Sequence, residues 1–138
     1  MSTAVDAPRL AWSYTARSNL YAAPIVADIH PSPGIETVIC DSEDQTVHCV
    51  SAGGHDLWKL CAPWNKRQAS SVAISAAARD GAATVAVANG DGTLLLLDAR
   101  TGKDVLKKTV TRVDRGGLLW ADLDGDGRDE LIVCGDDG

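Results

Sequence analysis

The sequence predicts an all-β protein built from repeated units, each a sheet of four antiparallel strands. Short apolar runs recur between turns that contain Gly, Asp or Pro, and no segment keeps a helical period. The pattern also repeats, because Asp28, Ser75 and Asp122 stand at intervals of 47 residues, and Thr46 and Thr93 keep the same interval. The length of 138 residues suffices for one domain with a hydrophobic core.

The first full unit is predicted at residues 23–62. It follows a leader at residues 1–8 and an outer strand at residues 9–15, which contains Trp12 and Tyr14. Its four strands are expected where apolar residues cluster between turns, at 23–28, 36–40, 46–50 and 56–60.

The second unit is predicted at residues 70–110, and the third, at 117–138, is only half a unit. The sequence Asn-Gly-Asp-Gly at 89–92 is a strong hairpin signal within the second unit. The strands of these units are expected at 71–74, 83–87, 93–97 and 103–107, and then at 117–121 and 131–134 on either side of an acidic loop.

Units of four strands and about 40–50 residues are typical of the blades of β-propellers. The predicted fold is therefore a single β-propeller region over residues 1–138, with about two and a half to three blades of four antiparallel strands. A closed propeller has four or more blades. The chain is thus expected to be an incomplete ring or a fragment that assembles with other copies of itself.

A metal site is predicted in the acidic loop of the half unit. Calcium takes six to eight oxygen ligands at about 2.3–2.6 Å, and alternate residues of a tight loop can supply them. Two glycines at 125 and 127 permit so sharp a turn. The predicted ion is Ca2+, and its expected ligands are the carboxylates of Asp122, Asp124, Asp126 and Glu130 and the backbone carbonyl of Arg128.

Two other interpretations of this loop fit the sequence less well. An EF-hand needs a helix on each side and a bidentate Glu at the twelfth loop position, which is Val133 here, so neither condition is met. A solvated acidic turn that binds nothing is the simpler alternative. The DxDGDG spacing closed by an acid favours the calcium loop, because it is far more specific than a lone acidic cluster.

Composition excludes some classes of partner. The net charge of −6 argues against nucleic acid and anionic membranes, because both need clustered Lys and Arg. No apolar run is long enough for a membrane span, and the start lacks the features of a signal peptide. The four cysteines form no CxxC pair and are expected as buried thiols; a disulfide between Cys40 and Cys49 is the minority alternative.

The repeats resemble two related propeller families. The segment 120–138 resembles an FG-GAP repeat of integrin α-chain propellers, in which the DxDGDG loop binds calcium. The segments 47–58 and 94–106 resemble repeats of propellers related to pyrroloquinoline-quinone (PQQ) dehydrogenases. In those, an Asp-Ala-x-Thr-Gly-Lys turn follows the third strand, and a tryptophan on the fourth strand docks against the next blade.

The resemblance implies docking roles for Trp12 and Trp58, whereas Leu106 stands where a third tryptophan is expected. It would also suit an extracellular or periplasmic protein, although the chain itself leaves the compartment open. The loop at 28–36 keeps both terminal acids, but His30 and Ser32 replace two carboxylates, and the loop at 75–83 has lost its acids. No ion is expected in either loop, and His30 is expected to be a surface residue.

These features predict a calcium-binding β-propeller module that acts as a protein-interaction scaffold and is not an enzyme. Calcium would be structural, and the partner would be another protein or other copies of the chain. One alternative is a fragment of a PQQ-dependent dehydrogenase-like enzyme, whose cofactor site would need a whole ring. Another is a truncated or engineered fragment that self-assembles. No nucleophile, His and acid set for catalysis is evident around His30, His48 or His55.

Overall fold

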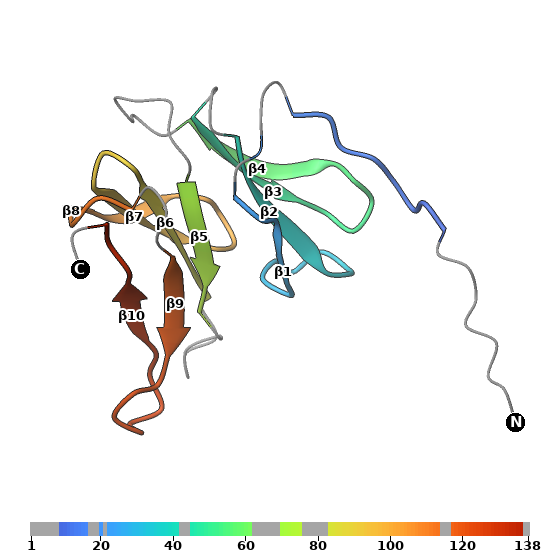
Figure 1. Cartoon of the computed structure of the whole chain (residues 1–138). Helices are drawn as coiled ribbons and strands as arrows, with labels where there is room; N and C mark the ends of the chain where they lie inside the picture. Colours follow the sequence, from blue (N-terminus) through green and yellow to red (C-terminus); the bar gives the residue numbers. More distant parts are fainter. Residues whose placement is uncertain are drawn as a thin grey trace, which may run out of the picture.

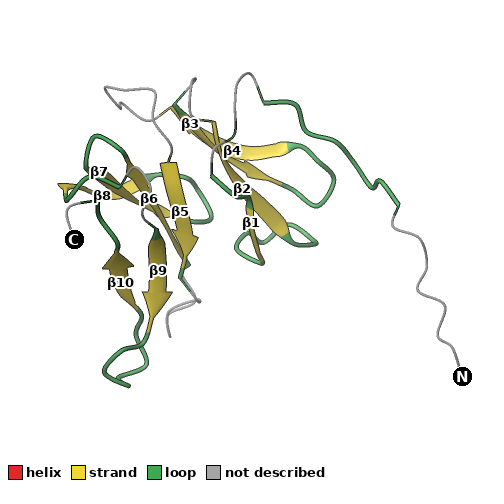
Figure 2. Ribbon diagram, viewed as in Figure 1, coloured by secondary structure: helices red, strands yellow, loops and turns green. Residues whose placement is uncertain are grey.

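The computed structural model describes residues 9–16, 20, 22–41, 45–61, 70–75, 83–113 and 117–136. These residues form β-strands and no helix, in three antiparallel sheets of four, four and two strands (Figures 1 and 2). The all-β prediction is therefore confirmed. The described residues accordingly contain no helix that is long and apolar enough to cross a membrane.

The first sheet is a simple meander, in which each strand pairs with the next one along the chain. Its strands are β1 (Ile25–Ala27), β2 (Glu36–Asp41), β3 (Thr46–Val50) and β4 (Asp56–Cys61). Each begins and ends within two residues of the predicted strand. Turn residues separate the apolar runs, so the chain reverses at each of them.

The second sheet repeats this plan. Its strands are β5 (Ser70–Ile74), β6 (Thr84–Asn89), β7 (Thr93–Asp98) and β8 (Asp104–Thr109), again in sequence order. The register between the third and fourth strands shifts at Cys49/Val50 in the first sheet and at Leu96/Leu97 in the second. These irregularities are also 47 residues apart, which is the interval found in the sequence.

The third sheet contains two described strands, β9 (Leu118–Ala121) and β10 (Glu130–Val133), which pair as a hairpin. β9 contacts β5, the first strand of the second sheet. In the same way, β5 contacts β1, the first strand of the first sheet. Figure 1 shows these first strands facing one another, while β4 and β8 lie at the far sides of their sheets.

The hydrophobic core is divided between the two spaces that separate the sheets. Side chains alternate along β6, so that Val85 and Val87 join one cluster while Ala86 and Ala88 join the other. The first cluster contains Val47 and other residues of the first sheet, and the second contains residues that pack against β9 and β10. Burial on both faces explains why the second unit reads as a nearly continuous apolar run.

Trp58 joins the first sheet to the second. Its indole Nε1 donates a hydrogen bond of 2.8 Å to the carbonyl oxygen of Ala99, and its ring lies against Gly102. Asp98 shapes this turn, because its carboxylate accepts hydrogen bonds from the backbone N–H and the hydroxyl of Thr101, both at 2.8 Å. The hydroxyl bond is the main reason that the pKa of Asp98 is lowered. The predicted docking role of Trp58 is confirmed.

Trp12 makes the corresponding contact one repeat earlier. A Cβ added to Gly54, in the turn between β3 and β4, would lie 3.2 Å from three atoms of Trp12. However, the outer strand predicted at 9–15 is not formed, since none of these residues belongs to a strand. A strand requires a ladder of backbone hydrogen bonds, and no strand of the described residues pairs with this segment. Side chains hold it in place instead.

The cysteines only partly follow the prediction. Cys40 and Cys49 are buried, whereas Cys61 and Cys134 are exposed, and none of the four forms a disulfide. Cys40 lies opposite Val47 and Cys49 lies opposite Val38, so the two thiols are not a directly opposed pair. Burial is the main reason that the pKa of Cys49 is raised to about 12, and this keeps the thiol protonated and unreactive.

Candidate metal centre

The acidic loop joins β9 to β10 and folds around one carboxylate. Asp122 accepts a hydrogen bond of 2.7 Å from the Gly125 N–H with Oδ1 and one of 2.9 Å from the Gly127 N–H with Oδ2. Both glycines have positive φ angles, 77° and 85°. A side chain at either position would strain the backbone, so the two glycines are part of the local reason for this loop shape.

Glu130, the first residue of β10, reaches back across the loop. Its Oε2 accepts a hydrogen bond of 2.8 Å from the Leu123 N–H. Asp124 Oδ1 in turn accepts one of 3.1 Å from the Asp126 N–H. The loop therefore holds its acids through backbone donors, which carry no full charge.

The structure brings three of the predicted ligands together. One carboxylate oxygen from each of Asp122, Asp124 and Glu130 lies within 4.8 Å of the others. Asp122 and Asp124 are exposed, while Glu130 is partly buried. These three residues can bind a metal ion, and a donor set made only of oxygen suits hard cations. In the described part of the chain this is the one such group of His, Cys, Asp and Glu side chains.

Of the other two predicted ligands, Asp126 is a carboxylate outside this group, and Arg128 would contribute a backbone carbonyl. Asp126 Oδ1 accepts a hydrogen bond of 2.8 Å from the Arg128 N–H, and Asp126 is not one of the three clustered acids. Coordination by Asp126 and by the carbonyl oxygen of Arg128 therefore stays a prediction.

The loop of the first unit has the same frame but lacks the two middle acids. Glu36, equivalent to Glu130, is fully buried and accepts hydrogen bonds from the N–H groups of Ile29 at 3.0 Å and His30 at 3.2 Å. Ile29 is the equivalent of Leu123, so this contact recurs in both loops. The hydroxyl of Ser32 donates to Glu36 Oε1 at 3.1 Å, in the place where the other loop has Asp126.

His30 is therefore more than the surface residue that the sequence predicts. It is partly buried, and its Nδ1 accepts a hydrogen bond of 3.1 Å from the Ser32 N–H. In this loop the hydroxyl of Ser32 and the imidazole of His30 form hydrogen bonds within the loop. The loop before β10 has carboxylates at the two equivalent positions. Most of the third predicted loop, at 75–83, lies outside the described residues.

Sequence reasoning missed a second cluster of polar side chains. Tyr14, His48 and Asp56 form a hydrogen-bonded group on the first sheet. The residues are far apart along the chain, and they match no motif. The one available signal is the alternation of side chains along β3. Because Val47 and Cys49 face the core, His48 must face away from it.

Comparison with known proteins adds no relative. No protein-family model matches the chain, and the search of the curated proteins found no significant match.

Proposed function

We propose that this chain is a calcium-binding β-propeller module that serves as a protein-interaction scaffold, with a structural rather than catalytic ion. The observation that carries the proposal is the convergence of Asp122, Asp124 and Glu130 in the loop between β9 and β10. Calcium is the proposed ion because it accepts irregular cages of carboxylate, carbonyl and water oxygens. Magnesium demands a nearly ideal octahedron and is a poorer fit to a loop of this kind.

The proposed ion would tie together the two ends of a hairpin. Asp122 directly follows β9 and Glu130 begins β10, so an ion held by both would restrain the loop at its base. It would also neutralise acids that otherwise repel one another. An ion that binds only the folded chain adds RT ln(1 + [L]/Kd) to the free energy of unfolding.

The propeller arrangement is supported by the way the sheets repeat. The first strands β1, β5 and β9 lie next to one another, and the sheets share one strand order. Trp12 and Trp58 make equivalent contacts with the turns at Gly54 and Gly102. Sheets that repeat with contacts only between neighbours are what a propeller requires.

A scaffold role is supported by the surface. Large apolar side chains are exposed at several points, including Val105 (69%) and Leu119 (58%), and the chain is acidic overall. Exposed apolar residues of this size are common at protein contacts. We therefore propose a protein partner rather than nucleic acid or membrane.

One observation favours self-assembly as a second candidate function. In the described residues β10 pairs with β9 alone, so its other edge has no strand beside it. Open edges recruit further strands, and another copy of the chain can supply them. A discrete multimer in light scattering would support self-assembly, and a monomer at all concentrations would contradict it.

Thermal unfolding of the unmodified chain tests the calcium assignment. The melting temperature should rise with added Ca2+ and much less with Mg2+, and it should fall again with a chelator. Equal melting under all three conditions would contradict the proposed ion.

A further inference from the structure

A cavity of about 450 Å³ lies on the first sheet, away from the proposed calcium loop. Val47 and Cys49 of β3 point into the core, so Thr46 and His48 point to the opposite face. The cavity lies on that face, and the segment 9–16 forms its other side through Tyr14, Thr15 and Ala16. The volume falls within the range of small-molecule sites.

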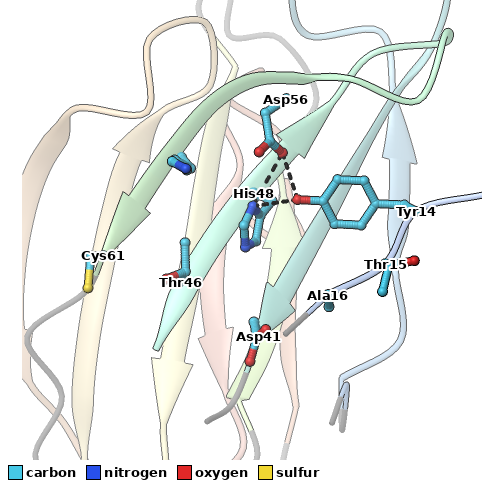
Figure 3. A pocket seen from close by; sticks show the side chains of 9 residues that line it. Tyr14, Thr15, Ala16, Asp41, Thr46, His48, Asp56 and Cys61 are labelled. Atoms are coloured by element: carbon cyan, nitrogen blue, oxygen red, sulfur yellow. Dashed lines mark hydrogen bonds and ion pairs between the residues drawn. The ribbon is translucent and has the colours of Figure 1, made fainter. Parts of the chain in front are cut away.

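Three side chains on its wall form a closed hydrogen-bonded group (Figure 3). The Tyr14 hydroxyl donates to Asp56 Oδ1 at 2.8 Å, and it also lies 2.8 Å from His48 Nδ1. A hydroxyl has one proton, and here it is directed at Asp56. The short contact with Nδ1 therefore requires His48 to donate, and Asp56 Oδ1, at 3.3 Å, is a second acceptor for the same N–H.

This geometry decides which nitrogen of His48 is available. With the proton on Nδ1, the neutral imidazole has a bare lone pair on Nε2. Figure 3 shows that this second ring nitrogen points away from Tyr14 and Asp56, toward the side of the cavity where Asp41 and Thr46 lie. His48 is 12% exposed, so its ring is held firmly and presents a hydrogen-bond acceptor to the cavity.

The charged side chains among the described lining residues are mostly acidic. They are the carboxylates Asp41 and Asp56 and the cation Lys59. Burial, the hydrogen bond to Asp56 and the charges of Asp56 and Asp41, in that order, raise the pKa of Tyr14 to about 12. The ring of Tyr14 and the methyl of Ala16 add apolar surface to the same wall.

We propose that this cavity binds the primary ammonium group of an alkylamine, with His48 Nε2 and the Asp41 carboxylate on the ammonium and Tyr14 and Ala16 along the alkyl chain. An ammonium offers three donors and one positive charge, which match an acceptor lone pair and a carboxylate. A free small amine and a lysine side chain of a protein partner share this chemistry. The inference is independent of the calcium loop and stands if that site fails.

The test is an NMR titration of the unmodified full chain at about pH 8, where a primary alkylamine is still protonated. n-Butylamine should shift the His48 ring signals with a roughly millimolar dissociation constant, as expected for so small a ligand. n-Butanol and butyrate are the matched probes without the positive charge, and neither should bind comparably. A blocked lysine, Nα-acetyl-lysine methylamide, separates the sources: binding indicates a lysine-bearing partner, and exclusion with retained butylamine binding indicates a free amine.

Two substitutions give opposite expected shifts. Lys59→Gln removes the competing cation from an exposed side chain and should tighten butylamine binding about two- to fivefold. Asp41→Asn should weaken it about five- to tenfold, and if this buried change prevents folding, Lys59→Gln alone still decides. Lys107→Gln, on β8 of the second sheet, is the matched control and should leave binding unchanged.

Three results would overturn the proposal. They are the absence of any butylamine shift at His48, equal binding of n-butanol, and weaker rather than tighter binding of butylamine by Lys59→Gln. The last result would mean that the lysine, and not the carboxylates, dominates the cavity.

Discussion

The indole N–H of Trp58 donates a 2.8 Å hydrogen bond to the carbonyl oxygen of Ala99, 41 residues further along the chain. This contact joins the fourth strand of one sheet to a turn of the next. Trp58 is 9% exposed, and it is part of the larger hydrophobic cluster that fills the space between the two sheets. Trp58 therefore contributes both apolar surface and a satisfied polar group to the interface between the sheets.

Replacing Gly102 with Ala should weaken this interface. Gly102 has a φ of 67°, and an added Cβ would overlap the indole ring of Trp58. Strain and overlap together should cost about 1–3 kcal/mol of the free energy of unfolding, measured by urea denaturation. Gly117→Ala is the matched control, because an added Cβ there meets no heavy atom within 4 Å. Equal losses in both variants would contradict a docking role for this turn.

The sequence predicts the repeated strands well because their apolar runs are short and bounded by turn residues. Thr46 and Thr93 are separated by the same number of residues as the register shifts near Val50 and Leu97. The segment at 9–15 has the same kind of composition, yet it forms no strand. Composition describes a side chain's preference, whereas a strand also needs a partner edge.

The candidate sites differ in how far the sequence predicts them. Asp122, Asp124 and Glu130 are close in sequence, so their spacing alone indicates that they converge. The Tyr14, His48 and Asp56 group depends on how a segment lies against a sheet, and no local spacing encodes that. Asp126 shows a further limit of sequence-based prediction. The spacing predicts it as a ligand, but its carboxylate accepts a hydrogen bond from the Arg128 N–H, which the spacing does not predict.

Replacing Asp124 with Ala should abolish stabilisation by calcium. The variant loses one of the three clustered carboxylates, so its melting temperature should be the same in calcium and in chelator. The unmodified chain should melt about 5–10 °C higher in calcium at a hundred times its dissociation constant. Asp104→Ala, an exposed acid on β8, is the control and should keep the full calcium shift. A calcium shift that survives in the Asp124 variant would contradict the assignment.

Replacing Glu36 with Ala should show that the loop at 28–36 binds no calcium. Glu36 is fully buried and accepts hydrogen bonds from Ile29, His30 and Ser32, so its loss leaves donors unsatisfied. We expect a loss of about 1–3 kcal/mol in the free energy of unfolding, with no change in the number of bound calcium ions. Loss of one ion in equilibrium dialysis would show that the loop at 28–36 also binds metal.

The contact of Tyr14 with Asp56 should make stability depend on alkaline pH. The pKa of Tyr14 is raised from 10.0 to about 12 in the folded chain, with burial as the largest cause. The folded state therefore holds this proton more tightly than the unfolded state. The resulting stability is complete below pH 10 and is lost as the pH rises toward 12.

Tyr14→Phe should make stability fall less steeply between pH 10 and 12, as followed by urea denaturation at several pH values. The part that Cys49 contributes, because its pKa is also raised to about 12, should remain. The chain has two tyrosines, so loss of the higher transition in a tyrosinate absorbance titration of the variant assigns it to Tyr14. An unchanged alkaline slope would show that the hydroxyl is free of Asp56 in solution.

The central claim is that the loop from Asp122 to Glu130 binds calcium, and titration calorimetry of the full chain tests it most directly. The unmodified protein should bind one Ca2+ per chain through this loop, and the Asp124→Ala variant should give no binding heat. Absence of binding by the unmodified protein, or an unchanged isotherm for the variant, would contradict the claim and leave the loop as a solvated acidic turn.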